Sequence, residues 1–156
     1  MLREFQTILD KNVDSTYKAE VAMKTGMGVL KDFANKTAEF PAAETAEGIF
    51  LVDKERVPTG TDCARGDMSD YDKAFTDVAA NEFVKLPTYV AGEAFGTDQF
   101  VSAGLTAGNR VAVGTDGKWK KAGASISSRY VYTGIHSDAG NTLARIEVAG
   151  EAKVNA

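Results

Sequence analysis

The sequence is poor in the side chains that most often build metal and catalytic centres. Among its 156 residues it has one cysteine, Cys63, and one histidine, His136. A single cysteine excludes an intramolecular disulfide and a cysteine-based zinc site, and it fits a reducing compartment. A single histidine means that a catalytic triad or a multi-histidine zinc site would need residues from elsewhere. We expect both residues to be dispensable for function.

Long apolar stretches are also missing. No run approaches the roughly 20 residues needed to cross a bilayer, and the first six residues have no apolar centre, so no secretory signal is visible. The formal net charge of −4 repels nucleic acid over most of the surface. The hydrophobic fraction of 44% and charged fraction of 26% are ordinary for a soluble globular protein. We expect one domain, either alone or carrying an arm, and neither a membrane nor a nucleic acid as partner.

Short motifs with known chemistry are few and incomplete. Gly26-x-Gly28 lacks the third glycine of a dinucleotide fingerprint. Arg65-Gly66-Asp67 matches the tripeptide that integrins recognise, but three residues carry little information. Asp67, Asp70 and Asp72 lack the spacing, glycine and terminal glutamate of an EF-hand loop. Two carboxylates alone suffice for glycoside hydrolysis, and a sequence cannot show whether two of them come together in the fold. We therefore expect no enzyme, no cofactor, no metal ion and no catalytic residue.

Residues 105–148 show the best agreement between turn chemistry and strand periodicity. Asp116-Gly117 separates 110–113 from 118–120, and such a pair supplies the positive φ angles of a tight hairpin turn. Residues then alternate in polarity over 128–135 and 143–148, with Ala144, Ile146 and Val148 on one face. The sequence predicts a mainly β fold, an antiparallel sandwich or small barrel built from hairpins.

Helical spacing occurs in two short places. Leu2, Phe5, Ile8 and Leu9 recur at helical intervals before the polar segment 10–16, which predicts a short N-terminal helix or arm over 1–16. A helix of this length is marginal in water, so it must pack on its own domain or on a neighbouring subunit. The segment 70–78 allows a second helix with Asp70 as its N-cap. We expect residues 17–156 to form a single β-rich domain.

Two parts of that domain resemble each other. From Gly26 the sequence predicts a strand that follows a glycine, then a turn, a strand that begins with lysine, and an apolar strand. The same order of elements recurs from Gly108. The first two elements recur at a constant offset of 82 residues (108 − 26 and 118 − 36), with a slip of one by the last strand. The pattern indicates two similar hairpin units, 17–57 and 101–150, as the halves of a sandwich or barrel.

The C-terminal third carries a resemblance to a known class. The segments that carry it are, in order, Thr106-Ala-Gly-Asn-Arg-Val-Ala-Val-Gly114, an Asp-Gly turn, Lys118-Trp-Lys-Lys-Ala122, Tyr130-Val-Tyr-Thr-Gly-Ile135 and Leu143-Ala-Arg-Ile-Glu-Val148. Together they resemble the head decoration, or capsid cement, proteins of tailed bacteriophages. The resemblance implies a non-enzymatic virion structural protein that is made in the host cytoplasm, binds the outer surface of the phage head and stabilises it. Its partners would be the major capsid protein and further copies of itself.

Two interpretations of binding follow. For a decoration protein, the candidate capsid-binding arm is the apolar stripe of Leu2, Phe5, Ile8 and Leu9, followed by a polar linker. The alternative is a soluble β-sandwich binding module, for example for carbohydrate. In that case Trp119, Tyr130 and Tyr132 are candidates for an exposed stacking platform.

Overall fold

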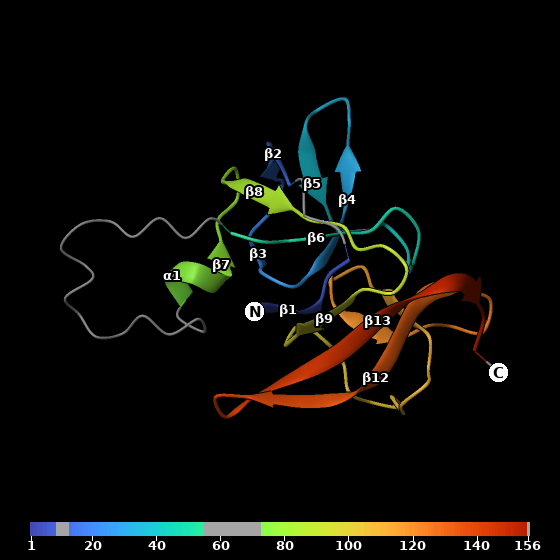
Figure 1. Cartoon of the computed structure of the whole chain (residues 1–156). Helices are drawn as coiled ribbons and strands as arrows, with labels where there is room; N and C mark the ends of the chain where they lie inside the picture. Colours follow the sequence, from blue (N-terminus) through green and yellow to red (C-terminus); the bar gives the residue numbers. More distant parts are fainter. Residues whose placement is uncertain (9–12, 55–72, 156) are drawn as a thin grey trace.

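The fold is almost entirely β, as the sequence predicts (Figure 1). The structure is a computed structural model that describes residues 1–8, 13–54 and 73–155. Within these ranges the one α-helix is a four-residue turn, α1 (Lys73–Thr76). It falls inside the predicted helix 70–78, although the proposed cap, Asp70, lies outside the described residues.

The first half of the chain forms a small, barrel-like ring of strands. Its 5-stranded sheet has the order β6-β4-β5-β2-β8, built from β2 (Asp14–Ala19), β4 (Gly28–Asp32), β5 (Thr37–Glu39), β6 (Phe50–Leu51) and β8 (Phe83–Leu86). Asp53, just beyond β6, exchanges two backbone hydrogen bonds with Lys85 of β8, at 2.9 and 3.0 Å. These bonds join the two ends of the sheet, so the ring is nearly closed.

The second half forms a similar ring. Its strands are β9 (Ala94–Thr97), β10 (Val111–Val113), β11 (Trp119–Lys121), β12 (Ser128–Asp138) and β13 (Asn141–Lys153). β13 pairs with both β9 and β12, and a bridge from Arg110 to Val131 connects β12 to the β10–β11 hairpin. Beyond β9 the chain runs parallel to β11 through the Phe100–Trp119 bridge, which completes the ring.

The strand pairings of the two rings correspond. Lys18 pairs with Thr37 in parallel in the first ring, and Phe100 pairs with Trp119 in parallel in the second, each 82 positions later (100 − 18 and 119 − 37). The antiparallel pairs β4–β5, β4–β6 and β2–β8 have counterparts in β10–β11, β10–β12 and β9–β13. The Asp53–Lys85 contact corresponds to the β12–β13 hairpin.

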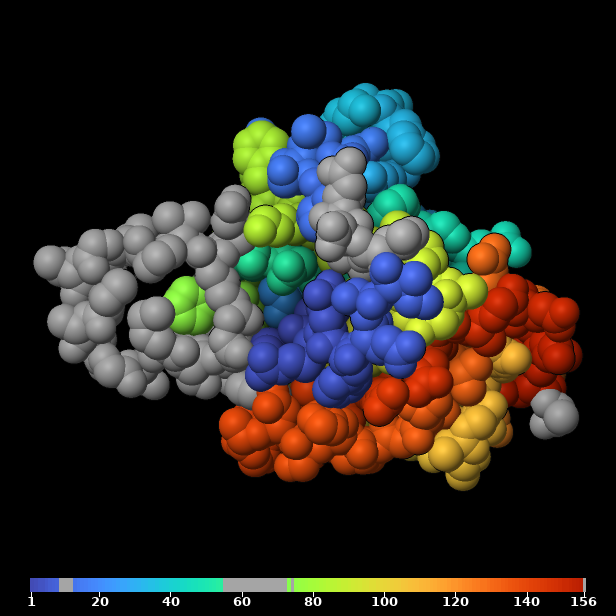
Figure 2. Space-filling view, viewed as in Figure 1, coloured from blue at the N-terminus to red at the C-terminus, as the bar shows by residue number. Residues whose placement is uncertain are grey.

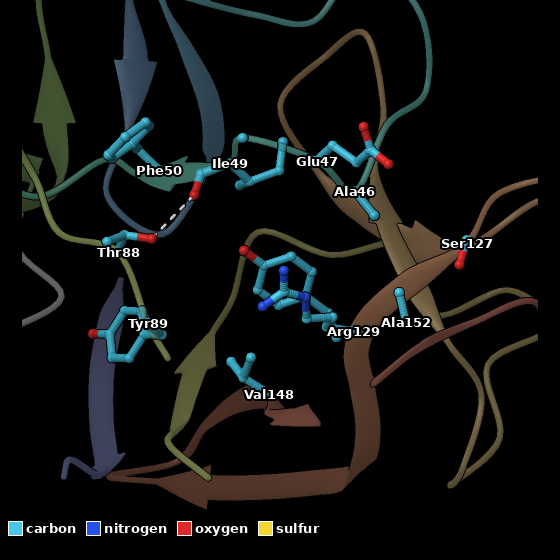
Figure 3. Close-up of a pocket in the computed structure, with 12 residues that line it drawn as sticks. Ala46, Glu47, Ile49, Phe50, Thr88, Tyr89, Ser127, Arg129, Val148 and Ala152 are labelled. Atoms are coloured by element: carbon cyan, nitrogen blue, oxygen red, sulfur yellow. Dashed lines mark hydrogen bonds between the residues drawn. The ribbon is translucent and has the colours of Figure 1, made fainter. Parts of the chain in front are cut away.

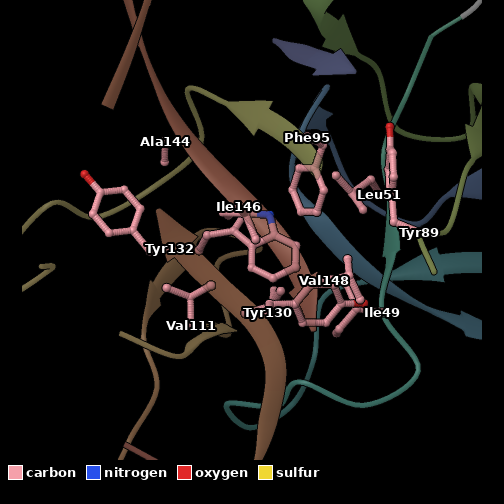
Figure 4. Close-up of a cluster of buried hydrophobic side chains, with 12 residues drawn as sticks. Ile49, Leu51, Tyr89, Phe95, Val111, Tyr130, Tyr132, Ala144, Ile146 and Val148 are labelled. Carbon is pink, nitrogen blue, oxygen red and sulfur yellow. The ribbon is translucent and has the colours of Figure 1, made fainter. Parts of the chain in front are cut away.

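One strand separates two hydrophobic cores. Ile49 and Leu51 pack in the core of the second ring, which also holds Phe95, Trp119 and Ile146 (Figure 4). Phe50 and Val52, which alternate with them along the strand, belong to the core of the first ring. β6 and its flanks are therefore buried on both faces, and this explains why 48–52 is a continuous apolar run rather than an alternating one.

A buried carbonyl ties the rings together. The Gly26 oxygen of the first half accepts hydrogen bonds from Trp119 Nε1 at 3.1 Å and from Thr97 Oγ1 at 3.0 Å, both in the second half. Buried polar groups without a partner are costly, so each of these contacts fixes one half relative to the other.

The predicted Asp-Gly hairpin is confirmed. β10 and β11 pair from Val111–Lys121 to Val113–Trp119, and Gly114 N–H donates to the Lys118 carbonyl at 2.9 Å. Gly117 has a φ of 74°, and a Cβ there would lie 2.5 Å from the Phe40 ring. This position therefore requires glycine both for its backbone conformation and for the close approach of the first half.

The predicted N-terminal helix is wrong. Leu2–Gln6 is a strand, β1, that pairs antiparallel with β9 at the edge of the sheet β1-β9-β13-β12. Leu2 packs against the core of the second ring, whereas Phe5 lies over Gly96 and contacts His136 on the opposite face of the sheet. Pairing with β9 satisfies the backbone groups of a segment too short to be a stable helix alone.

A two-stranded pair, β3 (Met23–Lys24) with β7 (Asp77–Val78), lies beside the first ring next to α1 (Figure 1).

The N-terminal residues lie against strands of the second half in the space-filling view (Figure 2). The first eight residues thus belong to the compact body rather than to a free arm.

Candidate binding site

A pocket lies where the two rings meet (Figure 3). Its volume is about 450 Å³, within the range of roughly 300–1,000 Å³ that is usual for ligand sites. The first half contributes residues 46–50, the second half contributes Arg129, Tyr130 and Val148, and the connection between them contributes residues 88–89. Clefts between two packed units are common places for ligands.

An irregularity in strand pairing builds the pocket. Ser128 pairs with Lys153, but Tyr130 already pairs with Val148, so the register shifts between them. Consecutive residues of a regular strand point to opposite faces, whereas a bulge can redirect a side chain toward a site. Here both Arg129 and Tyr130 line the pocket, and Ala152 reaches it from the extra residues of β13.

The pocket combines an apolar floor with polar groups. Ile49, Tyr130 and Val148 are buried, and Thr88 Oγ1 donates to the Ile49 carbonyl at 3.5 Å (Figure 3). Burial raises the pKa of Tyr130 to about 12, while the positive charge of Arg129 acts in the opposite direction. At neutral pH the hydroxyl is therefore protonated and able to donate a hydrogen bond.

A second candidate surface is the tip of the β4–β5 hairpin, which projects from the first ring in Figure 1. Phe33 sits in this turn with 71% of its surface exposed. The Asp32 carboxylate accepts hydrogen bonds from the backbone N–H of Ala34 and Asn35 and from the Asn35 amide group. These bonds lower the pKa of Asp32 and fix the turn that presents Phe33.

The base of this hairpin is held by a half-buried lysine. Lys31 Nζ lies 2.8 Å from the Asp14 carboxylate, 4.7 Å from the Tyr17 ring centroid and 4.3 Å from that of Phe50. The hydrogen bond from Lys31 is the main reason that the pKa of Asp14 falls well below its usual value. Phe33 in turn packs edge-on against Tyr17 at 6.4 Å. The hairpin is therefore anchored to the ring rather than loosely attached.

The four residues of the predicted capsid-binding arm differ in their surroundings. Leu2 and Phe5 pack within the chain, as described above, and Ile8 is 58% exposed. The backbone N–H of Ile8 donates to the buried carboxylate of Glu93 at 2.9 Å. Leu9 lies outside the described residues. Among the described members, Ile8 alone has a largely exposed side chain that a partner can reach.

The predicted stacking platform for carbohydrate is wrong. Trp119 has 0% of its surface exposed, and Tyr130 and Tyr132 are buried in the same hydrophobic cluster (Figure 4). The Trp119 ring packs against Tyr130 and Phe95 at centroid distances of 4.8 and 5.4 Å. These aromatics form a core, so a sugar cannot stack on Trp119.

The other residues singled out in the sequence do not come together. Cys63, Arg65-Gly66-Asp67 and the aspartates at 67, 70 and 72 all lie outside the described residues. His136 is an exposed residue of β12, two residues before the end of that strand. Its ring meets Phe5 edge-on at 4.6 Å.

Within the described ranges, no group of three or more histidine, cysteine, aspartate or glutamate residues is arranged to hold a metal ion. The same ranges contain no helix of the length and apolar character needed to span a bilayer. The chain matches no protein-family model, no curated protein and no solved structure.

Sequence reasoning missed the pocket and its arginine. Arg129 is an exposed residue of an alternating strand, and nothing in that pattern shows the register shift that brings it into the pocket with Tyr130. The exposed phenylalanine at 33 was within reach of sequence analysis, because it stands between the turn-forming residues Asp32 and Asn35.

Proposed function

We propose that this chain is a non-enzymatic structural protein of a phage virion that binds the outer surface of the head and stabilises the shell. The proposal rests on the resemblance of residues 106–148 to head decoration proteins. The chain is made in the host cytoplasm and acts on the exterior of the assembled head. Its partners are the major capsid protein and neighbouring copies of itself.

The observation that carries the proposal is the locked, projecting turn that exposes Phe33. Binding costs conformational entropy, and a rigid aromatic side chain on a fixed turn loses little of it. Aromatic residues that fill a pocket on the partner also contribute much of the affinity of protein interfaces. A decoration protein needs only a modest contact of this kind, because repeated copies on one particle gain avidity.

The test compares the unmodified chain with Phe33→Ser in binding isotherms on expanded heads of the phage that encodes it. We expect Phe33→Ser to weaken binding at least about tenfold, as expected for loss of an anchor residue. Its unfolding free energy should fall by no more than about 1.5 kcal/mol, since the side chain is mostly exposed and loses only its edge contact with Tyr17.

Phe83→Ser is the matched control. Phe83 is also an exposed phenylalanine, at 60%, but it lies within β8 beneath the Lys18 ammonium rather than on a projecting turn. It should bind heads like the unmodified chain. Equal binding by Phe33→Ser and the unmodified chain would contradict the assignment of Phe33 to the contact with the head.

A further inference from the structure

The pocket between the rings contains hydrogen-bond donors that no described residue satisfies. The Arg129 guanidinium forms neither an ion pair nor a side-chain hydrogen bond within the described part of the chain. The Tyr130 hydroxyl likewise has no hydrogen-bonding partner there and is not sealed from solvent. Both groups line the same cavity because of the register shift in β12.

These donors favour an anion with two oxygens in one plane, such as a carboxylate. An arginine fork matches the two oxygens of a carboxylate, and a neutral tyrosine hydroxyl can donate a further hydrogen bond. Beside them the floor of Ile49 and Val148 is apolar, so burying a hydrocarbon group against it is favourable. The cavity of about 450 Å³ has room for both parts of such a ligand.

One acidic residue also lines the pocket. Glu47 belongs to the opposite wall, and Figure 3 shows its carboxylate directed away from Arg129. It is exposed to solvent, which screens its repulsion of a second carboxylate. The local charge at the apolar floor is therefore that of Arg129.

We infer that the pocket between the two rings binds a carboxylate carried on an apolar body, with Arg129 and the Tyr130 hydroxyl holding the carboxylate and Ile49 and Val148 contacting the apolar part. The inference does not depend on head binding. The same chemistry is offered by a small free acid and by an acidic residue next to an apolar one in a protein segment.

The experiment titrates the full chain with N-acetylphenylalanine and, separately, with N-acetylphenylalaninamide, which has the same apolar group but no charge. Methyl resonances of Ile49 and Val148 report binding by NMR. We expect saturable shifts with the acid and an affinity at least about tenfold weaker for the amide, because charge-assisted hydrogen bonds are stronger than neutral ones. Equal affinities, or no saturable shift at these methyl groups with the acid, would overturn the inference.

Variants assign the carboxylate to its donors. Arg129→Gln should abolish the preference for the acid, and Arg129→Lys should keep part of it through a single charge. Glu47→Gln is the matched control at the same pocket and should bind the acid at least as tightly as the unmodified chain. Both positions are exposed, so these variants are expected to fold. An unchanged preference in Arg129→Gln would contradict the assignment.

A capped Phe-Glu dipeptide amide distinguishes the two sources of the ligand. If it binds more tightly than N-acetylphenylalanine, the pocket is suited to a protein segment, and if it binds less tightly, to a small free acid. Either result with shifts at Ile49 and Val148 supports the inference, and failure of both ligands to bind there refutes it.

Discussion

Tyr130 shows how one residue serves both the core and the surface. Its ring packs against Trp119 at 4.8 Å, edge-on, and lies in the hydrophobic core of the second ring. The residue also lines the pocket, together with Arg129. Tyrosine suits such a position because one end is apolar and the other can hydrogen-bond to water or a ligand.

Burial of this phenol predicts a loss of stability at alkaline pH. The unfolded chain releases the proton near pH 10, whereas the pKa of Tyr130 in the folded chain is raised to about 12. Between these values the folded state binds more protons than the unfolded state, so stability falls as pH rises. The slope should be on the order of 1 kcal/mol per pH unit from this residue.

Urea unfolding at a series of pH values above 10 measures this slope, with tyrosinate absorbance as a second signal. Tyr130→Phe should unfold with a shallower alkaline decline, since it has one buried phenol fewer. Burial also raises the pKa of Tyr89, which should keep part of the decline in the variant. Identical slopes for both proteins would show that Tyr130 ionises without unfolding.

Residue patterns predicted which side chains share a face, but not how deeply they lie. Tyr130 and Tyr132 share a face in the sequence and in the structure, and Ala144, Ile146 and Val148 share theirs. Whether an aromatic face is a core or an exposed platform depends on what covers it. Here the cover includes Ile49 and Leu51 from the other half of the chain, which no local pattern reveals.

At the scale of elements, β1 depends on a glycine in its partner strand. Gly96 of β9 pairs with Arg3 on one side and with Arg145 on the other. A Cβ at this glycine would lie 2.6 Å from the Phe5 ring, which crosses the strand to reach His136. The absence of a side chain at 96 therefore allows the N-terminal strand to dock.

A double-mutant cycle tests this dependence. Gly96→Ala should destabilise the protein by about 1–3 kcal/mol through overpacking against Phe5. In a Phe5→Ala background the same substitution should cost much less, because the ring that it displaces is gone. Urea unfolding of the four proteins gives the coupling energy, and strictly additive effects would mean that the two residues do not compete for this space.

The sequence predicted hairpins better than isolated edge strands. The turn at Gly117 requires a positive φ angle, which is a local property of the Asp-Gly pair, so β10 and β11 were predicted from the sequence alone. β1 was mistaken for a helix because Leu2 and Phe5 stand at helical spacing, although they lie on opposite faces of a sheet. The partner that decides its structure, β9, is far away in the chain, so no local pattern in the N-terminal segment identifies it.

At the scale of the whole molecule, two similar rings share a wall. β6 supplies side chains to both cores, and the Gly26 carbonyl accepts hydrogen bonds from Trp119 and Thr97 of the other half. The repeated offset of 82 positions was visible in the sequence, but the parallel pairs Lys18–Thr37 and Phe100–Trp119 require long-range contacts. Periodicity within one strand cannot identify such a partner.

This shared wall predicts that the two rings unfold together. Trp119, the single tryptophan, reports the second ring by fluorescence, and far-UV circular dichroism reports the strands of both. The two signals should give coincident urea transitions, as in a two-state protein. Separate midpoints would show that the rings are independently stable and that β6 couples them weakly.

The proposed role on the phage head is tested most directly by co-sedimentation of the purified, unmodified chain with expanded heads of the phage that encodes it. Heads lacking the chain are mixed with increasing amounts of it, sedimented, and the bound fraction is measured. A decoration protein should pellet with heads in a saturable manner and leave the supernatant until sites on the shell are filled. A chain that stays in the supernatant at every concentration would contradict the proposal.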